Sequence, residues 1–342
     1  MNVKKLLSLI LVVAISMGVL TACSKPAEDK TNETAQETVA EIQPVNINMA
    51  VLKGPTGIGA AKLINDSTAG ETFNTYNFTV CAAPDEAMAG IISGEFDVAA
   101  VASNLAPTIY NKTEGKIQIA ALNTLGILYV VEIGETINSI EDLNGVDVVS
   151  SGMGSTVEYA TNFILETAGV VPASLEYRAE HGELAAELAA GTVKVGIVPE
   201  PHLTSVLMNN PDARIALNLT EEWDKAVAGT EHEGSALTMG CIVVNKEFAA
   251  NNKDAFNKFL EEYEASINFA NSNVQETSVM VETAGIMPKA AVAAKAIPNC
   301  NIVYIDGEDM VSTVEPFFGI LFNANPKSVG GALPDEEFYY TK

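Results

Sequence analysis

Two loops of the chain combine glycine with hydroxyl side chains at the expected start of a helix. The first is Thr56-Gly57, which follows Lys53, and the second is Gly154-Ser155-Thr156. Glycine lets a ligand approach the backbone, and hydroxyls together with the unpaired N–H groups of a helix start donate hydrogen bonds to an anion. The same hydroxyls also serve as plain helix caps. The loops therefore predict either a small-anion site or two caps, and binding is favoured if both loops face one cleft.

Three further loops place polar residues where expected strands lead into helices: Ala83-Pro84-Asp85-Glu86, Ala102-Ser103-Asn104 and Pro199-Glu200-Pro201. In open parallel sheets, ligands bind at this edge. Asp85 and Glu200 repel a bare anion and suit an amine or a ring N–H, although Glu200 also fits a plain acidic helix start. We therefore expect a zwitterion or a polar heterocycle rather than an inorganic anion. The candidate ligand-binding residues are Lys53, Thr56, Gly57, Asp85, Ser103, Asn104, Gly154, Ser155, Thr156 and Glu200.

The other chemically active residue types form no catalytic or metal-binding pattern. A heterocycle needs an aromatic wall, and the candidates, which also suit core packing, are Tyr110, Tyr129, Tyr159 and Trp223. The scattered histidines are predicted to be surface or capping residues: His181, His202 and His232. No two cysteines have a C-x-x-C spacing, and Cys81 and Cys241 lie in apolar runs that favour burial. We expect no catalytic residue, no metal and no cofactor, so the chain is not predicted to be an enzyme.

Short apolar runs that alternate with helical stretches must position these loops. Strands are expected at 45–52, 76–81, 97–101, 117–122, 146–150, 175–178 and 193–198, with helices between them. This rhythm predicts parallel sheets covered by helices, and its pause near residue 130 predicts a second sheet. Gly94 and Gly191 follow helices of similar sequence and fit the left-handed position at a helix end. Leu237–Val244 is expected to cross back to the first sheet.

Composition and the first residues indicate an exported protein. The chain has 342 residues and a net charge of −25, which disfavours nucleic acid and anionic lipid surfaces as partners. Lys4 and Lys5 precede the apolar run 6–20, and Leu20-Thr21-Ala22-Cys23 resembles a lipobox. We expect a signal peptide at 1–22, lipid attachment at Cys23 and a flexible linker at 23–43. An ordinary cleaved secretion signal is the alternative.

The loops together resemble those of solute-binding proteins of ABC importers. The resemblance rests on Lys53-Gly-Pro-Thr-Gly57, Pro84-Asp85-Glu86, Ser103-Asn104, Gly154-Ser155-Thr156 and Val198-Pro199-Glu200-Pro201. Within that family it points to the group that serves nitrate, sulfonates, taurine and thiamine pyrimidine precursors. It implies an α/β fold of the type II periplasmic-binding-protein kind, with two doubly wound lobes, a ligand cleft between them and two crossings. Lobe 1 would comprise 44–130 and 238–342, and lobe 2 would comprise 131–237.

The resemblance also implies a function and partners. A lipid-anchored monomer outside the cytoplasmic membrane would capture a sulfonate, an amino-sulfonate or a pyrimidine-type heterocycle, and deliver it to ABC permease subunits. Two alternatives remain at this point: a surface lipoprotein for sensing or adhesion, and an enzyme related to thiamine-pyrimidine synthesis. The lack of a cysteine cluster weakens the second alternative. If Gly154-Ser155-Thr156 contacts the ligand, alanine at Ser155 and Thr156 should weaken binding with little loss of stability.

Overall fold

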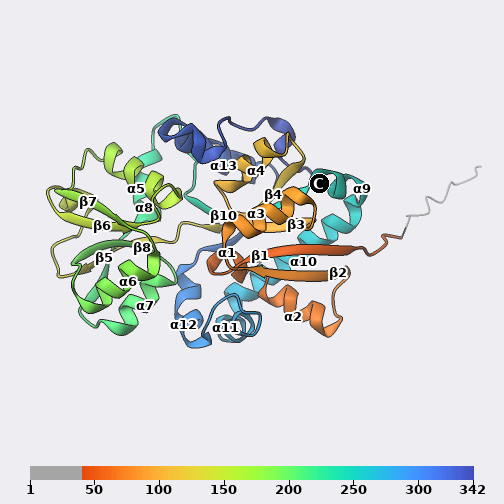
Figure 1. The fold of residues 1–342 in the computed structure, drawn as a ribbon, viewed down its shortest axis with the longest axis horizontal. Helices are drawn as coiled ribbons and strands as arrows, with labels where there is room; N and C mark the ends of the chain where they lie inside the picture. Colours follow the sequence, from red (N-terminus) through yellow and green to blue (C-terminus); the bar gives the residue numbers. More distant parts are fainter. Residues whose placement is uncertain (1–40) are drawn as a thin grey trace, which may run out of the picture. The chain divides into compact units, whose positions relative to one another are not determined.

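The computed structural model describes residues 41–342, of which Ile42–Lys342 form one compact unit (Figure 1). The expected signal peptide, Cys23 and the linker up to residue 40 lie outside the described residues. Within the part of the chain that is described, none of the helices combines the length and the apolar character needed to cross a bilayer. Two sheets organise this unit, as the pause in the strand rhythm predicted.

The first sheet has six strands in the order β11-β4-β10-β3-β1-β2. Their bounds are β1 Asn46–Leu52, β2 Thr75–Cys81, β3 Val98–Ala102, β4 Ile117–Leu125, β10 Thr238–Asn245 and β11 Ile302–Ile305. β1 pairs in parallel with β2 and β3, whereas β10 runs antiparallel between β3 and β4. The sheet is therefore mixed: the expected parallel pairing holds for β1, β2 and β3 and is wrong for β10.

The second sheet has five strands in the order β7-β6-β8-β5-β9. Their bounds are β5 Leu128–Ile133, β6 Asp147–Ser151, β7 Ser174–Arg178, β8 Val195–Pro199 and β9 Ala213–Asn218. β6 pairs in parallel with β7 and β8, while β5 runs antiparallel to β8 and β9. β5 belongs wholly to this sheet, so the proposed lobe boundary after residue 130 falls inside a strand. We use lobe 1 and lobe 2 for the first and second sheets with their helices.

Leu237–Val244 does not form the return crossing, because nearly all of it is β10. This strand lies in the centre of the first sheet, and Cys241, Ile242, Val243 and Val244 are fully buried. An apolar run buried on both faces is typical of a central strand. The return crossing is the preceding segment 228–237. The other crossing, residues 126–127, joins β4 directly to β5.

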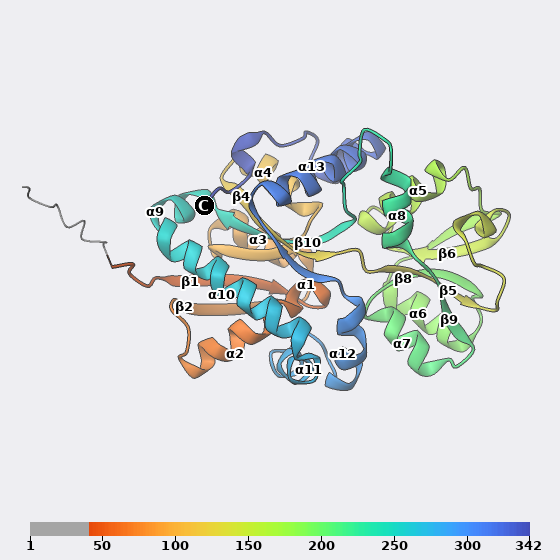
Figure 2. The same cartoon turned by 180° about the vertical axis from the view of Figure 1, so that it is seen from behind.

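Helices cover both faces of each sheet (Figures 1 and 2). Along β1, Ile47, Met49 and Val51 pack on one side and Ala50 and Leu52 on the other, because successive strand residues point to opposite faces. Gly94 and Gly191 end helices with φ of 80° and 74°, which confirms their predicted left-handed role. The main helices are α1 Pro55–Ile58, α2 Ala61–Ala69, α3 Pro84–Ser93, α4 Leu105–Lys112, α5 Thr156–Thr167, α6 His181–Ala190, α7 His202–Asn209, α8 Leu219–Val227, α9 Lys246–Asn251, α10 Lys253–Ser272, α11 Val274–Thr283, α12 Ala290–Ala296 and α13 Gly307–Ala324.

The crossing at residues 126–127 sets how the two sheets meet. β4 ends at Leu125 on the carboxyl edge of the first sheet, and β5 begins at Leu128 on the carboxyl edge of the β6–β8 ladder. Because only two residues separate these strands, the two edges face each other. Gly126 is packed closely here, since a Cβ at this position would lie 2.1 Å from Thr220 Oγ1. Helices also join the lobes, α12 against α7 and α13 against α5 (Figure 2).

Candidate functional site

The two facing edges bring helix N-termini together. Strands β2, β3, β6, β7 and β8 end there, and each leads within a few residues into a helix of at least eight residues: α3, α4, α5, α6 and α7. The first N–H groups of a helix have no partner within it, and the helix dipole is positive at that end. The edges shared by the two lobes therefore favour an anionic ligand.

A cavity of about 810 Å³ lies between the lobes on one side of these edges. Lobe 1 contributes the loop after β1 and the segment from α11 to α12, and lobe 2 contributes α7. Lys53 and Lys289 are exposed cations in the wall, whereas Glu282 is its single carboxylate. The wall residues are Lys53, Gly54, Pro201, His202, Ser205, Met208, Asn209, Glu282, Gly285, Ile286, Met287, Pro288, Lys289, Ala291 and Val292.

The lobe 1 edge carries a cluster of neutral polar groups beneath the loop after β1. Asn123 Nδ2 donates to the Thr56 carbonyl at 3.1 Å and to the Tyr263 hydroxyl at 2.9 Å, and Asn123 Oδ1 accepts from Thr124 Oγ1 at 3.1 Å. Sequence reasoning missed Asn123, because an Asn inside an apolar strand carries no motif. Ser103 Oγ is fully buried and has no hydrogen-bond partner among the described residues. An unpaired buried hydroxyl is costly, and a polar ligand would supply its partner.

The lobe 2 edge carries a pair of histidines that the sequence did not predict. His181 and His202 are the first residues of α6 and α7, and their ring centroids lie 5.6 Å apart. His181 Nδ1 shares a 2.7 Å hydrogen bond with Ser151 Oγ at the end of β6. Strands β7 and β8 flank β6, so the sheet order gathers residues distant in sequence. The available signal was that both histidines directly follow expected strands in the same lobe.

Two of the three residues in the Gly154-Ser155-Thr156 loop are engaged within the protein. Gly154 N–H donates to Glu158 Oε2 at 2.5 Å. Ser155 Oγ accepts from Val157 N–H at 3.2 Å and donates to the Gly152 carbonyl at 2.6 Å, as an N-cap residue does. Thr156 is buried in the first turn of α5. The capping interpretation of Ser155 is therefore correct, and a substitution there affects stability.

Replacing Ser155 with alanine should lower the free energy of unfolding by about 1 kcal/mol, because the cap of α5 is lost. Chemical denaturation of both proteins measures this difference. Ser155→Asp, which keeps a capping oxygen, should recover most of the stability. An alanine variant as stable as the wild type would contradict the capping role.

Glu200 is not free to meet a ligand amine, because its carboxylate is fully engaged. It is 1% exposed and accepts hydrogen bonds from Thr204 N–H at 3.1 Å, Thr204 Oγ1 at 2.9 Å and Asn299 Nδ2 at 3.1 Å. Burial raises its pKa, and the hydrogen bonds from Asn299 and Thr204 oppose that rise. Asn299 belongs to lobe 1, and its carbonyl also accepts from the Tyr129 hydroxyl at 3.0 Å. Glu200 therefore connects the lobes.

The other predicted residues lie at the lobe 1 edge, at helix starts or in the hydrophobic core. Thr56 lies beside Asn123 and Gly240. Gly57 is buried and packed too closely for a side chain, since a Cβ there would lie 2.1 Å from the Leu52 carbonyl oxygen. Asn104 begins α4 without a side-chain cap, and Asp85 is exposed in the first turn of α3. The aromatic candidates Tyr110, Tyr159 and Trp223 are buried core residues, and Tyr129 is 6% exposed.

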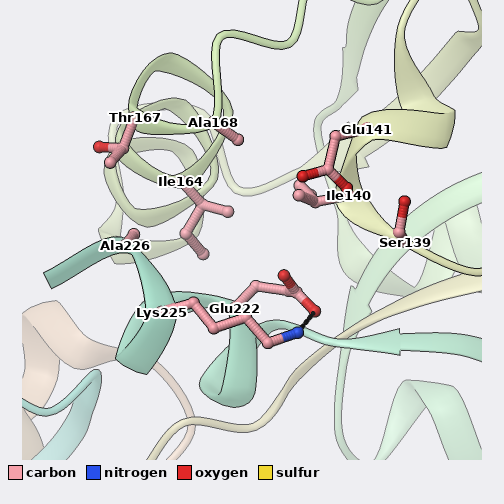
Figure 3. Close-up of a pocket in the computed structure, with 9 residues that line it drawn as sticks. All are labelled: Ser139, Ile140, Glu141, Ile164, Thr167, Ala168, Glu222, Lys225 and Ala226. Carbon is pink, nitrogen blue, oxygen red and sulfur yellow. Dashed lines mark hydrogen bonds and ion pairs between the residues drawn. The ribbon is translucent and has the colours of Figure 1, made fainter. Parts of the chain in front are cut away.

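A second, smaller depression of about 220 Å³ lies wholly in lobe 2 (Figure 3). Lys225 Nζ donates to Glu222 Oε1 at 2.8 Å along α8 on one side of it, and Glu141 lies on the opposite side (Figure 3). Ser139 and Ile140 follow β5, whose amino end is at the cleft edge, and Thr167 and Ala168 end α5, which starts at that edge. This depression is therefore at the far end of lobe 2 from the cleft.

The described residues contain no cluster of metal ligands, and their cysteines are buried. Within residues 41–342, no group of three or more His, Cys, Asp or Glu side chains is placed to hold a metal ion. Cys81, Cys241 and Cys300 are free and buried, as the sequence predicted for the first two. Buried thiols without a cationic neighbour are unreactive.

The chain matches a known family of solute-binding proteins over more than half of its length. Residues 75–266 match the family described as ABC transporter, phosphonate, periplasmic substrate-binding protein. The chain belongs to this family. A periplasmic substrate-binding protein of an ABC transporter binds its solute without converting it, so the expectation that the chain is not an enzyme is confirmed. The resemblance to solute-binding proteins of ABC importers is likewise confirmed.

Solved structures share the two-lobe fold of this substrate-binding protein. The crystal structure of an ABC transporter from Parabacteroides distasonis is 26% identical, with a TM-score of 0.72 over 86% of this chain and 99% of that chain. The periplasmic aliphatic sulphonate binding protein SsuA from Escherichia coli is 13% identical, with a TM-score of 0.66 over 87% of this chain and 93% of that chain. A zinc-bound ligand-binding component of an ABC-type import system from Staphylococcus aureus is 14% identical, with a TM-score of 0.62 over 87% and 97%. A search of the curated proteins found no significant match.

Proposed function

We propose that this substrate-binding protein captures a small organic oxyanion, a phosphonate or a sulfonate, in the cavity between its lobes and delivers it to an ABC permease. The observation that carries the proposal is the convergence of five helix N-termini on the edges that face each other, of which the start of α7 lines the cavity itself. Lys53 and Lys289 add two cations in the adjoining wall. The family description, which names phosphonate, and the sulphonate-binding protein of the same fold agree with this ligand class.

The geometry changes the ligand expected from the sequence. An amine or a ring N–H was expected to meet Glu200, but that carboxylate already accepts three hydrogen bonds from the protein. A simple heterocycle therefore loses its main predicted partner. Glu282 remains in the cavity wall and lies on the same wall as the two lysines. An amino-phosphonate or amino-sulfonate fits this arrangement, with its anion at the helix starts and its amine at Glu282.

We also propose that the protein acts outside the cytoplasmic membrane as a lipid-anchored monomer. The lipobox-like Leu20-Thr21-Ala22-Cys23 supports attachment at Cys23, and the polar segment that follows provides a tether. Labelling cells with a radioactive or clickable fatty acid tests the anchor. The wild type should carry the label, and Cys23→Ser should not; a labelled serine variant would contradict the assignment.

A thermal-shift panel tests the ligand class. It should include ethylphosphonate, 2-aminoethylphosphonate, ethanesulfonate, taurine, nitrate and a hydroxymethylpyrimidine, each with the purified protein. A ligand at a hundredfold excess over its Kd stabilises the native state by about 2.7 kcal/mol. We expect stabilisation by a phosphonate or a sulfonate, and weaker or no stabilisation by nitrate and the pyrimidine. Stabilisation by the pyrimidine alone would contradict the proposal.

A charge-matched pair of variants locates the site. Lys53→Ala with Lys289→Ala should weaken binding of the best oxyanion about tenfold, because two charge-assisted contacts at a partly exposed wall are lost. Lys258→Ala with Lys327→Ala removes the same charge away from the cavity and should leave the affinity within about twofold. Equal affinity in both double variants would place the ligand elsewhere.

A further inference from the structure

The pair of histidines at the lobe 2 edge has a role that capping does not explain. His181 begins α6, His202 begins α7, and the second ring lines the cavity between the lobes. The hydrogen bond between His181 Nδ1 and Ser151 Oγ leaves Nε2 of His181 as its free ring nitrogen. No hydrogen bond within the described residues occupies the ring nitrogens of His202. Two neighbouring imidazoles, with ring centroids 5.6 Å apart, thus each keep a ring nitrogen without a partner among the described residues.

The surroundings hold both rings in the neutral form while the site is empty. Burial lowers the pKa of His181, and burial together with the neighbouring His181 lowers the pKa of His202 to about 4. The start of a helix also disfavours a cation. Neither ring forms an ion pair with a carboxylate in residues 41–342; the one such pair there involves His232. The charged groups at the starts of α5 and α6, after β8 and in the cavity wall are Glu158, Glu180, Glu183, Glu200, Lys53, Glu282 and Lys289.

Those charged groups do not supply a counter-ion for the pair. Glu158 accepts from Gly154 N–H, and Glu200 accepts from Thr204 and Asn299. Glu180, Glu183 and Glu282 are exposed to solvent, which screens their charge. The two lysines carry the same charge as an imidazolium. An oxyanion that enters between the lobes is therefore the strongest negative charge that the two rings would meet.

We propose that His181 and His202 contact the bound oxyanion and take up protons from water as it binds, so that this pair sets the pH range over which the ligand is held. The inference rests on the proposed function, since it requires an anion in the cavity. An anion in contact with an imidazole favours the imidazolium. Each ring would gain one proton at its unprotonated nitrogen, which changes that nitrogen from an acceptor into a charged N–H donor to the oxyanion, and a charged donor forms a stronger hydrogen bond.

The direction of the pH effect follows from linkage. A ring with a low pKa in the empty protein and a higher pKa in the complex binds its proton together with the ligand. Affinity is therefore highest at low pH, and it falls as the pH rises from the pKa of the ring in the empty protein to its pKa in the complex. Between these two pKa values the affinity should fall by up to about tenfold per pH unit for each proton taken up. Between pH 5 and pH 8 we expect a fall of at least about tenfold.

Calorimetry and nitrogen NMR on the purified protein test the inference. The probes are ethanesulfonate, which does not titrate between pH 5 and pH 8, and ethylphosphonate, whose own titration is subtracted. Calorimetry gives Kd across this range, and the difference in binding enthalpy between two buffers of different ionisation enthalpy gives the number of protons taken up. In protein labelled with ¹⁵N-histidine, saturating probe at pH 6 should move the ring signals of His181 and His202 toward imidazolium values.

Matched variants assign the protons to residues. His202→Gln and His181→Gln keep a hydrogen-bonding side chain without a titrating ring, so each should flatten the pH dependence of Kd. His232→Gln, which alters the third histidine on a different surface, should keep the wild-type slope. The NMR measurement on the wild type stays decisive if a variant does not fold.

Three outcomes separate the inference from the proposed function. Probe binding with proton uptake and imidazolium signals supports both. Probe binding with an unchanged Kd from pH 5 to pH 8 and neutral ring signals overturns the role of the histidines and leaves the proposed function intact. If neither probe stabilises the protein at any pH, the proposed function fails and the inference fails with it.

Discussion

Replacing Trp223 with alanine should lower the free energy of unfolding by about 3–5 kcal/mol, a typical cost for removing a large buried aromatic side chain. Trp223 is fully buried, and its ring centroid lies 5.0 Å from that of Phe163 and 5.7 Å from that of Phe317. Its indole Nε1 donates to the Ser235 carbonyl at 3.2 Å. The side chain therefore joins α8, α5 and α13, and its removal loosens the packing of lobe 2 against α13.

Urea unfolding followed by circular dichroism measures this loss, because the fluorescence of the single tryptophan disappears with the substitution. Trp223→Phe keeps most of the buried area and should cost clearly less than alanine. Phe73→Ala is the surface control, since Phe73 is 38% exposed, and should change stability by less than about 1 kcal/mol. A loss below about 1 kcal/mol for Trp223→Ala would contradict its place in the core.

Replacing Asn123 with aspartate should cost about 2–4 kcal/mol at pH 8, because the change removes an amide donor and buries a negative charge. Asn123 is 1% exposed and holds the Thr56 carbonyl and the Tyr263 hydroxyl with the same amide group. An aspartate keeps the acceptor for Thr124 but leaves the Thr56 carbonyl without a donor. The loop after β1, which lines the cavity, would lose its support and bind ligand more weakly.

The pH dependence of this variant provides a second check. Burial raises the pKa of an introduced carboxyl above its value in the unfolded chain, so the folded state binds the proton more readily. Stability of the variant relative to the wild type should therefore recover as the pH falls from 8 to 5. Asn65→Asp is the control, because Asn65 is exposed and its amide is 3.4 Å from Asp66. A variant whose relative stability is the same at both pH values would show that residue 123 is solvated.

The local structure of this protein could largely be predicted from its sequence. The strands expected at 45–52 and 76–81 agree with β1 and β2 to within a residue, because alternation of apolar and polar residues is typical of a strand. Gly94 and Gly191 marked helix ends, since few other residues adopt a positive φ. Ser155 was predicted either to cap or to bind, and both interpretations follow from the same hydroxyl at a helix start.

Pairing between distant segments was harder to predict. The run that forms β10 gives no sign of its direction, because an apolar strand buried on both faces looks the same in parallel and antiparallel pairing. Its antiparallel place between β3 and β4 depends on where the return crossing from lobe 2 arrives. Asn123 was equally hidden, since its partners Thr56 and Tyr263 are far from it in sequence.

The sequence by itself determined that loops rich in small and polar residues follow the strands, and that these loops begin helices able to receive an anion. Only the tertiary structure decided which side chains in those loops are free. Glu200 is occupied by Thr204 and Asn299, whereas His181 and His202 lie together with open nitrogens. The physical reason is that hydrogen bonding and burial depend on neighbours supplied by other strands and by the other lobe. The sequence gives the order of these residues along the chain, but only the fold determines which of them come within hydrogen-bonding distance.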